Sequence, residues 1–155
     1  MAHLIFALRV LIGGLLVVAG FLKAHDGPTL TATFVAGYRI VPAVLIAPVA
    51  VALPYAEILL GGYLVAGLFT RLAAWIASAQ FVVFACAVAS LVLRHISADC
   101  GCFGQAVRTP PSWGHVATDL GFALLSAAIA LRAPGSFALD PLLGMGGSPR
   151  AKAEA

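Results

Sequence analysis

Long apolar runs, separated by short polar segments, dominate the chain. The clearest run covers residues 72–93, which contain no charged side chain and are bracketed by Arg71 and Arg94. A membrane-spanning helix needs about 20 mostly apolar residues, because the hydrocarbon core of a bilayer is about 30 Å thick. This run therefore predicts a transmembrane helix whose flanking arginines reach the two lipid–water boundaries.

Three further apolar runs predict three further spans, at about residues 4–22, 49–69 and 113–131. Arg9 lies near the start of the first span, and we expect its side chain to extend to the nearby membrane surface. A cleaved signal peptide is the competing interpretation of this segment. We favour a span, because the apolar core is long and no small-residue cleavage site follows it closely.

Prolines interrupt the apolar segment that leads into the second span. Residues 40–69 are apolar except for Glu57, are too long for one straight helix, and contain prolines at positions 42, 48 and 54. Proline removes a backbone donor and kinks or breaks a helix. We therefore predict a short interfacial or re-entrant piece around residues 30–47, between the first two spans.

The predicted fold class is all-α, an integral membrane four-helix bundle formed by residues 1–132. Only Thr70 and Arg71 separate the second and third spans, so we expect these helices to be antiparallel neighbours. Paired glycines at positions 13–14 and 61–62 indicate close helix approach rather than a ligand site. Residues 133–155 are rich in Gly and Pro, end in charged residues, and are predicted to form a flexible C-terminal tail.

Composition supports the cell membrane as the location. Of the 155 residues, 62% are apolar and 10% charged, against about 45–50% and about 25% in a typical soluble domain. These values exclude a disordered chain, a coiled coil and an ordinary cytosolic enzyme. The net charge of +3 is spread thinly along the chain, so the chain lacks the cluster of basic residues that nucleic-acid binding requires. Four spans place both termini on one side, and the distribution of Lys and Arg favours cytoplasmic termini and an extracytoplasmic cysteine loop.

Two of the three cysteines lie in the loop before the fourth span, within the sequence DCGCFG at residues 99–104. A single glycine separates Cys100 from Cys102, so a disulfide between them would close a very small ring that relaxed geometry hardly accommodates. Strained, exposed disulfides are the labile, oxidising ones, and a crosslink across so short a loop stabilises little. Thiol–disulfide exchange therefore fits this pair better than a structural crosslink.

Two other interpretations of the pair stay open. The thiols can be reduced and without function, or they can hold a soft ion such as copper or zinc together with Asp99, His95 or His115. No residue is assigned as a metal ligand. Cys86 lies among small and apolar residues of the third span, and we expect it to be a buried residue without chemistry.

The segment at residues 99–104, in a four-span protein, resembles the MauE family, often grouped with DoxX-like redox-associated membrane proteins. Other matching pieces occur in the expected order, at residues 19–23, 38–42, 53–57, 61 and 67–71. The resemblance covers about residues 4–132. It implies disulfide handling outside the cytoplasm, beside a thioredoxin-like partner. MauE proteins are associated with maturation of the disulfide-rich small subunit of methylamine dehydrogenase, but many relatives occur without a methylamine operon.

The general layout is also similar to the vitamin K epoxide reductase and DsbB families, whose four-helix bundles pass electrons between thiols and quinone. This similarity makes quinone a candidate cofactor. Tyr55 and Trp113 are expected first at the lipid–water boundary, and with Phe103 they are the candidates for contact with a quinone. The chain departs from those families in having one cysteine pair instead of two.

Ionisable side chains inside a span are functional candidates, because each costs about 2.5–3.5 kcal/mol on insertion at the centre of a helix. Glu57 is either a site of proton transfer or ligand binding, or a structural partner of Lys23 or Arg39. His115 and Asp119 are four residues apart and share one face of the fourth span. The carboxylate can orient the imidazole and so activate a loop thiol, or the two can form a purely structural pair.

The resulting hypothesis is a membrane thiol–disulfide oxidoreductase, or an accessory to one, that acts through Cys100 and Cys102 on an extracytoplasmic thioredoxin-like protein. The alternative is a non-catalytic subunit or assembly factor, packed in the bilayer against other membrane subunits. Gln80, inside the third span, is expected to make an interhelical hydrogen bond.

Overall fold

A computed structural model describes residues 2–96, 109–133 and 138–140. This part of the chain holds five helices and no strand: α1 (Ala2–Asp26), α2 (Pro28–Gly37), α3 (Ala43–Ala66), α4 (Thr70–Leu93) and α5 (Trp113–Arg132). All but α2 are long and apolar enough to cross a membrane. The predicted all-α class with four spans is therefore confirmed.

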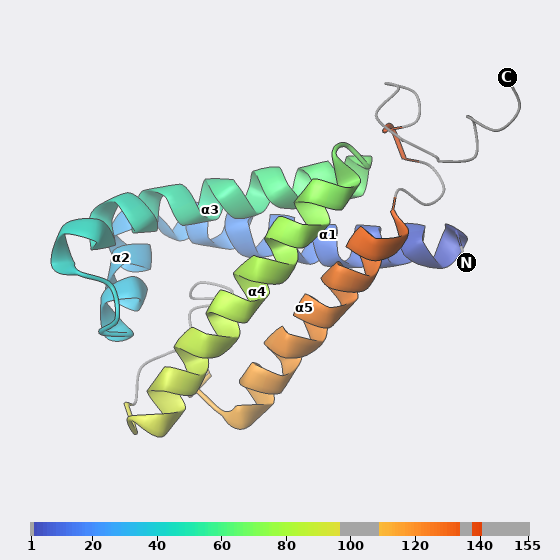
Figure 1. The fold of residues 1–155 in the computed structure, drawn as a ribbon. Helices are drawn as coiled ribbons and strands as arrows, with labels where there is room; N and C mark the ends of the chain where they lie inside the picture. The colour runs from blue at the N-terminus through green and yellow to red at the C-terminus, as the bar shows by residue number, and fades with distance from the viewer. Residues whose placement is uncertain (1, 97–108, 134–137, 141–155) are drawn as a thin grey trace, which may run out of the picture.

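The four long helices form two pairs (Figure 1). α1 runs along α3, and α4 runs along α5, whereas α3 and α4 meet at their turn and then diverge. α2 lies beside the end of α1 and packs on α3. The expected contact between the second and third spans is thus limited, and each of these helices has its main partner elsewhere.

Two ends of the bundle are distinguished below. The amino-terminal end comprises the start of α1, the turn between α3 and α4, and the end of α5. The loop end comprises the end of α1, the whole of α2, the start of α3, the end of α4 and the start of α5. Residues 97–108 join α4 to α5 and therefore connect to two helices at the loop end.

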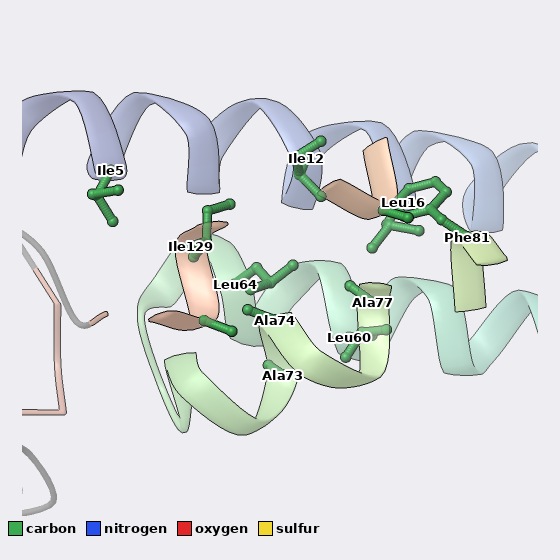
Figure 2. Packing of buried hydrophobic residues seen from close by; sticks show 12 residues of the cluster. Ile5, Ile12, Leu16, Leu60, Leu64, Ala73, Ala74, Ala77, Phe81 and Ile129 are labelled. Carbon is green, nitrogen blue, oxygen red and sulfur yellow. The ribbon is translucent and has the colours of Figure 1, made fainter. Parts of the chain in front are cut away.

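A core of buried apolar side chains joins the two helix pairs (Figure 2). Ile12 and Leu16 of α1, Leu64 of α3, Ala77 of α4 and Ile129 of α5 all belong to it. Small residues on α4 let the backbones approach, which favours association of helices that lipid surrounds. The outward faces carry many exposed large apolar side chains, as expected for contact with hydrocarbon.

Glycine allows the closest approach of α1 and α3. A side-chain carbon added at Gly13 would lie 2.7 Å from the carbonyl oxygen of Gly61, which is closer than any real contact allows. An added carbon at Gly14 or Gly62 would meet nothing within 4 Å among the described residues. The predicted role of the paired glycines is confirmed for Gly13 and Gly61 and is wrong for the two beside them.

The boundaries around the second span differ from the prediction. α3 begins at Ala43, before the predicted start, and continues through Pro48 and Pro54. Proline is tolerated inside membrane helices where neighbouring groups and local adjustments satisfy the freed backbone. The separate piece is α2, which starts with Pro28 in its first turn, where the missing donor removes no helical hydrogen bond. A short element between the first two spans is confirmed, but its predicted extent to residue 47 is wrong.

Arg9 is buried at the amino-terminal end, with 0% of its surface exposed, so the prediction that it reaches the surface is wrong. Its Nε donates to the carbonyl oxygen of Leu64 at 3.0 Å, and Nη2 donates to that of Val65 at 3.3 Å. Both carbonyls belong to the last turn of α3, where the backbone has no helical donor. Because lipid offers no water to satisfy them, Arg9 caps the C-terminus of α3.

Residues 138–140 complete the same turn. The backbone N–H groups of Leu139 and Asp140 donate to the carbonyl oxygen of Gly67 at 3.1 and 3.0 Å. Oδ2 of Asp140 accepts from the N–H of Thr70 at 2.9 Å, which places a negative charge at the N-terminus of α4. These residues lie within the predicted flexible tail, and Ala138 and Asp140 are buried. Apart from Ala133, the rest of the predicted tail, residues 134–137 and 141–155, lies outside the described residues.

Candidate functional site

The predicted cysteine pair, Cys100 and Cys102, lies with Phe103 outside the described residues. The chain enters that segment after Ile96 and leaves it before Thr109, and both of these residues lie at the loop end. The candidate site is accordingly built from the side chains that the described helices contribute at this end.

A partly enclosed cavity of about 640 Å³ lies at the loop end, between α2, the first half of α3 and the second half of α4. Its volume falls in the range of small-molecule sites, about 300–1,000 Å³. The walls are mostly aliphatic and aromatic, and Lys23 is the one charged residue among the described side chains that line it. Any molecule held here would be mainly apolar.

Lys23 forms a buried ion pair with Glu57 beside this cavity. Its Nζ donates to Oε2 of Glu57 at 2.8 Å and to Oε1 at 3.0 Å, and the two side chains are only 5% and 1% exposed. Nε2 of Gln80 donates to the same carboxylate at 3.4 Å, so the predicted interhelical hydrogen bond is confirmed. Gly20 of α1 makes room for the stem of Glu57, since an added carbon there would lie 2.9 Å from its Cβ. The pair thus links α1, α3 and α4.

His115 and Asp119 do not form the expected pair in the described part of the chain. Nε2 of His115 lies 3.0 Å from the hydroxyl of Thr109, and Nδ1 lies 2.8 Å from the hydroxyl of Ser112, both as hydrogen bonds. Oδ2 of Asp119 is buried, and no described residue forms a hydrogen bond with it. The imidazole is therefore oriented by two hydroxyls at the start of α5, one of which directly follows the cysteine segment.

Tyr55 and Trp113, the described candidates for quinone contact, both point outward, with exposed fractions of 58% and 57%. Neither lines the cavity. The aromatic rings that do line it belong to Phe34, Tyr38 and Phe84, which the sequence does not distinguish from other apolar residues. Of these three residues, only Tyr38 could have been singled out from the sequence, because residues 38–42 are one of the segments that resemble the MauE family.

Cys86 is exposed and lines the cavity, so its expected burial is wrong. The buried face of α4 at this level carries Ala85 and Val88, which pack against Val116 of α5. Cys86 lies on a different face of the helix. A span that is apolar all round gives no sequence signal for which face is covered.

Comparison with known proteins identifies the chain as a membrane protein of a known family. A family profile described as "Methylamine utilisation protein MauE" matches residues 1–132. The chain belongs to the MauE family. Methylamine utilization protein MauE of Paracoccus denitrificans is 34% identical over 131 residues, which cover 84% of this chain and 70% of that protein. No solved structure gives a significant match.

The MauE match ends at residue 132, the last residue of α5. It therefore includes all four spans, the cavity and the cysteine segment. The contacts made by residues 138–140 at the amino-terminal end lie beyond the MauE match.

Proposed function

We propose that this MauE-family membrane protein is a thiol–disulfide oxidoreductase, or an accessory to one, that acts on an extracytoplasmic thioredoxin-like protein. The observation that carries the proposal is the pair Cys100 and Cys102, one glycine apart, in a segment whose flanking residues Ile96 and Thr109 both lie at the loop end. A partner from the aqueous phase can reach a segment that begins and ends at the membrane boundary.

The proposed exchange balances within the two proteins. One thiolate of the pair attacks the partner's disulfide, a mixed disulfide forms, and the second thiol of the pair resolves it. The pair loses two electrons and two protons and becomes a disulfide, while the partner gains both and becomes a dithiol. The same steps in reverse reduce the pair. A strained Cys-Gly-Cys ring favours the direction in which the pair oxidises its partner.

We assign His115 the role of proton acceptor for the attacking thiol. Its ring is hydrogen-bonded to Thr109 and Ser112, at the point where the cysteine segment rejoins the helices, and this arrangement supports the assignment. Asp119 has no part in it, and Glu57, paired with Lys23, has a structural role. The proposal also stops at the thioredoxin-like partner and includes no quinone step, because Tyr55 and Trp113 lie away from the cavity.

Counting free thiols in cell membranes tests the proposal. Proteins are denatured in acid, tagged with a maleimide polymer before or after reduction, and separated by size. We expect one tag before reduction, at Cys86, and three tags after it, because the chain has three cysteines. Cys86→Ser is the matched control and should remove one tag from both samples. A pair that stays reduced in every sample, and that oxidised thioredoxin-like protein leaves unchanged, contradicts the proposal.

Single replacements distinguish exchange from the role of a non-catalytic subunit. Cys100→Ser and Cys102→Ser each prevent resolution of the mixed disulfide, so the variant that retains the attacking thiol should accumulate a covalent complex with its partner. Equal function of wild type and the double variant would instead support a subunit or assembly factor. Membrane-impermeant maleimide applied to intact cells tests the expected extracytoplasmic side of the pair.

A further inference from the structure

Two exposed arginines, Arg39 and Arg94, adjoin residues that line the loop-end cavity without lining it themselves. Arg39 stands between Tyr38 and Ile40, which both line the cavity. Nη1 of Arg94 donates to the carbonyl oxygen of Tyr38 at 3.2 Å, so both arginines adjoin the same short turn. Among the described residues, neither forms an ion pair, and the buried carboxylate of Glu57 is already paired with Lys23.

Two residues beside this cavity adopt the left-handed backbone conformation. Arg39 follows the end of α2 with a φ of 52°, and His95 follows the end of α4 with a φ of 52°. Glycine adopts this left-handed conformation more easily and is the usual residue just past a helix. At the amino-terminal end, Gly67 has a φ of 71° just past α3, although Phe69, just before α4, also has a positive φ of 47°. At the loop end the same position instead carries a cationic or titratable side chain.

The two arginines and the apolar cavity together resemble a binding site for a lipid with a charged head group. The cavity has apolar walls formed by spans α3 and α4 and by α2, so hydrocarbon can enter it from the membrane. Guanidinium groups bind phosphate oxygens through paired hydrogen bonds, so two arginines beside an apolar cavity suit an anionic head group. We propose that this cavity binds an anionic phospholipid, with an acyl chain between α2, α3 and α4 and the phosphate on Arg39 and Arg94. The proposal does not depend on the redox function.

Cys86 provides a built-in reporter, because it is exposed on the cavity wall. In the Cys100→Ser/Cys102→Ser background it is the only cysteine, and its alkylation by N-ethylmaleimide can be followed by intact mass in a neutral detergent. We expect phosphatidylglycerol to slow alkylation saturably, and at lower concentration than phosphatidylcholine with the same acyl chains. Arg39→Gln and Arg94→Gln should each raise the half-protecting concentration of phosphatidylglycerol about fivefold, without changing that of phosphatidylcholine.

Control variants separate binding from folding. Arg71→Gln and Arg132→Gln remove exposed arginines at the opposite end and should leave both lipid curves unchanged. Arg39→Gly removes the charge and relieves the strained φ, so it should fold at least as well as wild type and still raise the half-protecting concentration of phosphatidylglycerol about fivefold, as Arg39→Gln does. Equal protection of the wild type by the two lipids, an unchanged phosphatidylglycerol curve in Arg39→Gly, or stronger protection by a short-chain quinone that is unaffected by removal of either arginine would each overturn the proposal.

Discussion

The buried ion pair of Lys23 and Glu57 supports a quantitative prediction. Replacing Glu57 with leucine leaves the ammonium of Lys23 without the carboxylate that now binds it at 2.8 and 3.0 Å. It also removes the acceptor of Gln80. Lys23 belongs to the last turn of α1, so its long side chain can turn toward the membrane boundary, whereas the shorter Glu57 is held in the interior of α3.

Removing one partner of a buried pair costs about 3–5 kcal/mol of folding free energy, whereas replacing both partners with apolar residues is neutral or stabilising by about 1–4 kcal/mol. We therefore expect Glu57→Leu to lose about 3 kcal/mol, at the low end of that range because Lys23 can reach the boundary. The double variant Lys23→Met/Glu57→Leu should be at least as stable as wild type. Gln80→Leu, which removes only the weaker hydrogen bond, should lose about 1 kcal/mol.

Reversible unfolding in mixed micelles of dodecyl maltoside and sodium dodecyl sulfate, followed by circular dichroism, measures these differences. The single variants Lys23→Met and Glu57→Leu form a cycle with their double variant, and the double should recover most of the stability that the two singles lose. A double variant that loses as much as the sum of the singles would refute the reasoning. Thiol counting on the same double variant then tests the structural role of Glu57, because exchange at Cys100 and Cys102 should be unaffected.

Three further predictions concern packing and capping. Gly61→Ala should lose about 1–3 kcal/mol of stability in the same unfolding assay, because the added carbon meets the backbone of α1, whereas the neighbouring Gly62→Ala should be neutral or gain about 0.5–1 kcal/mol; equal effects would refute the close approach. Asp140→Ala should lose about 0.5–2 kcal/mol with the cap of α4, and an unchanged midpoint would show that the contact contributes nothing. Arg9→Lys should be clearly less stable than wild type, because one ammonium cannot replace the planar fork that reaches two carbonyls; wild-type thermal stability would contradict this.

Hydropathy predicts the four spans because the thickness of the bilayer sets the length of every helix that crosses it. The boundary of α3 was harder to predict, since the rule that proline ends a helix comes from water and is relaxed in lipid. The burial of Arg9 could not be read from its position near the start of α1. It depends on contact with the end of α3, more than fifty residues later in the chain, and no local sequence pattern predicts a contact between such distant segments.

In the candidate site, too, some features could be predicted from the sequence and others depend on the tertiary structure. The insertion cost of a carboxylate identifies Glu57 as significant, and Lys23 was one of its predicted partners. The spacing of His115 and Asp119 gave the correct helix but the wrong partner, because hydroxyls preceding α5 already satisfy the imidazole. The cavity carries no sequence signal, since it results from how α3 and α4 diverge, and the lipid-facing and cavity-facing sides of these spans are equally apolar.

The contact between Asp140 and Thr70 bears on the order of events during synthesis. α4 leaves the ribosome seventy residues before the carboxylate that caps it, so it must enter the bilayer with its first N–H group uncapped. The turn after α3 gains its final hydrogen bonds only when the polypeptide beyond α5 has emerged and returned to it. The amino-terminal end of the bundle, although it contains the first residues to be synthesised, is therefore the last to be completed. A fusion partner joined directly after α5 would prevent that final step.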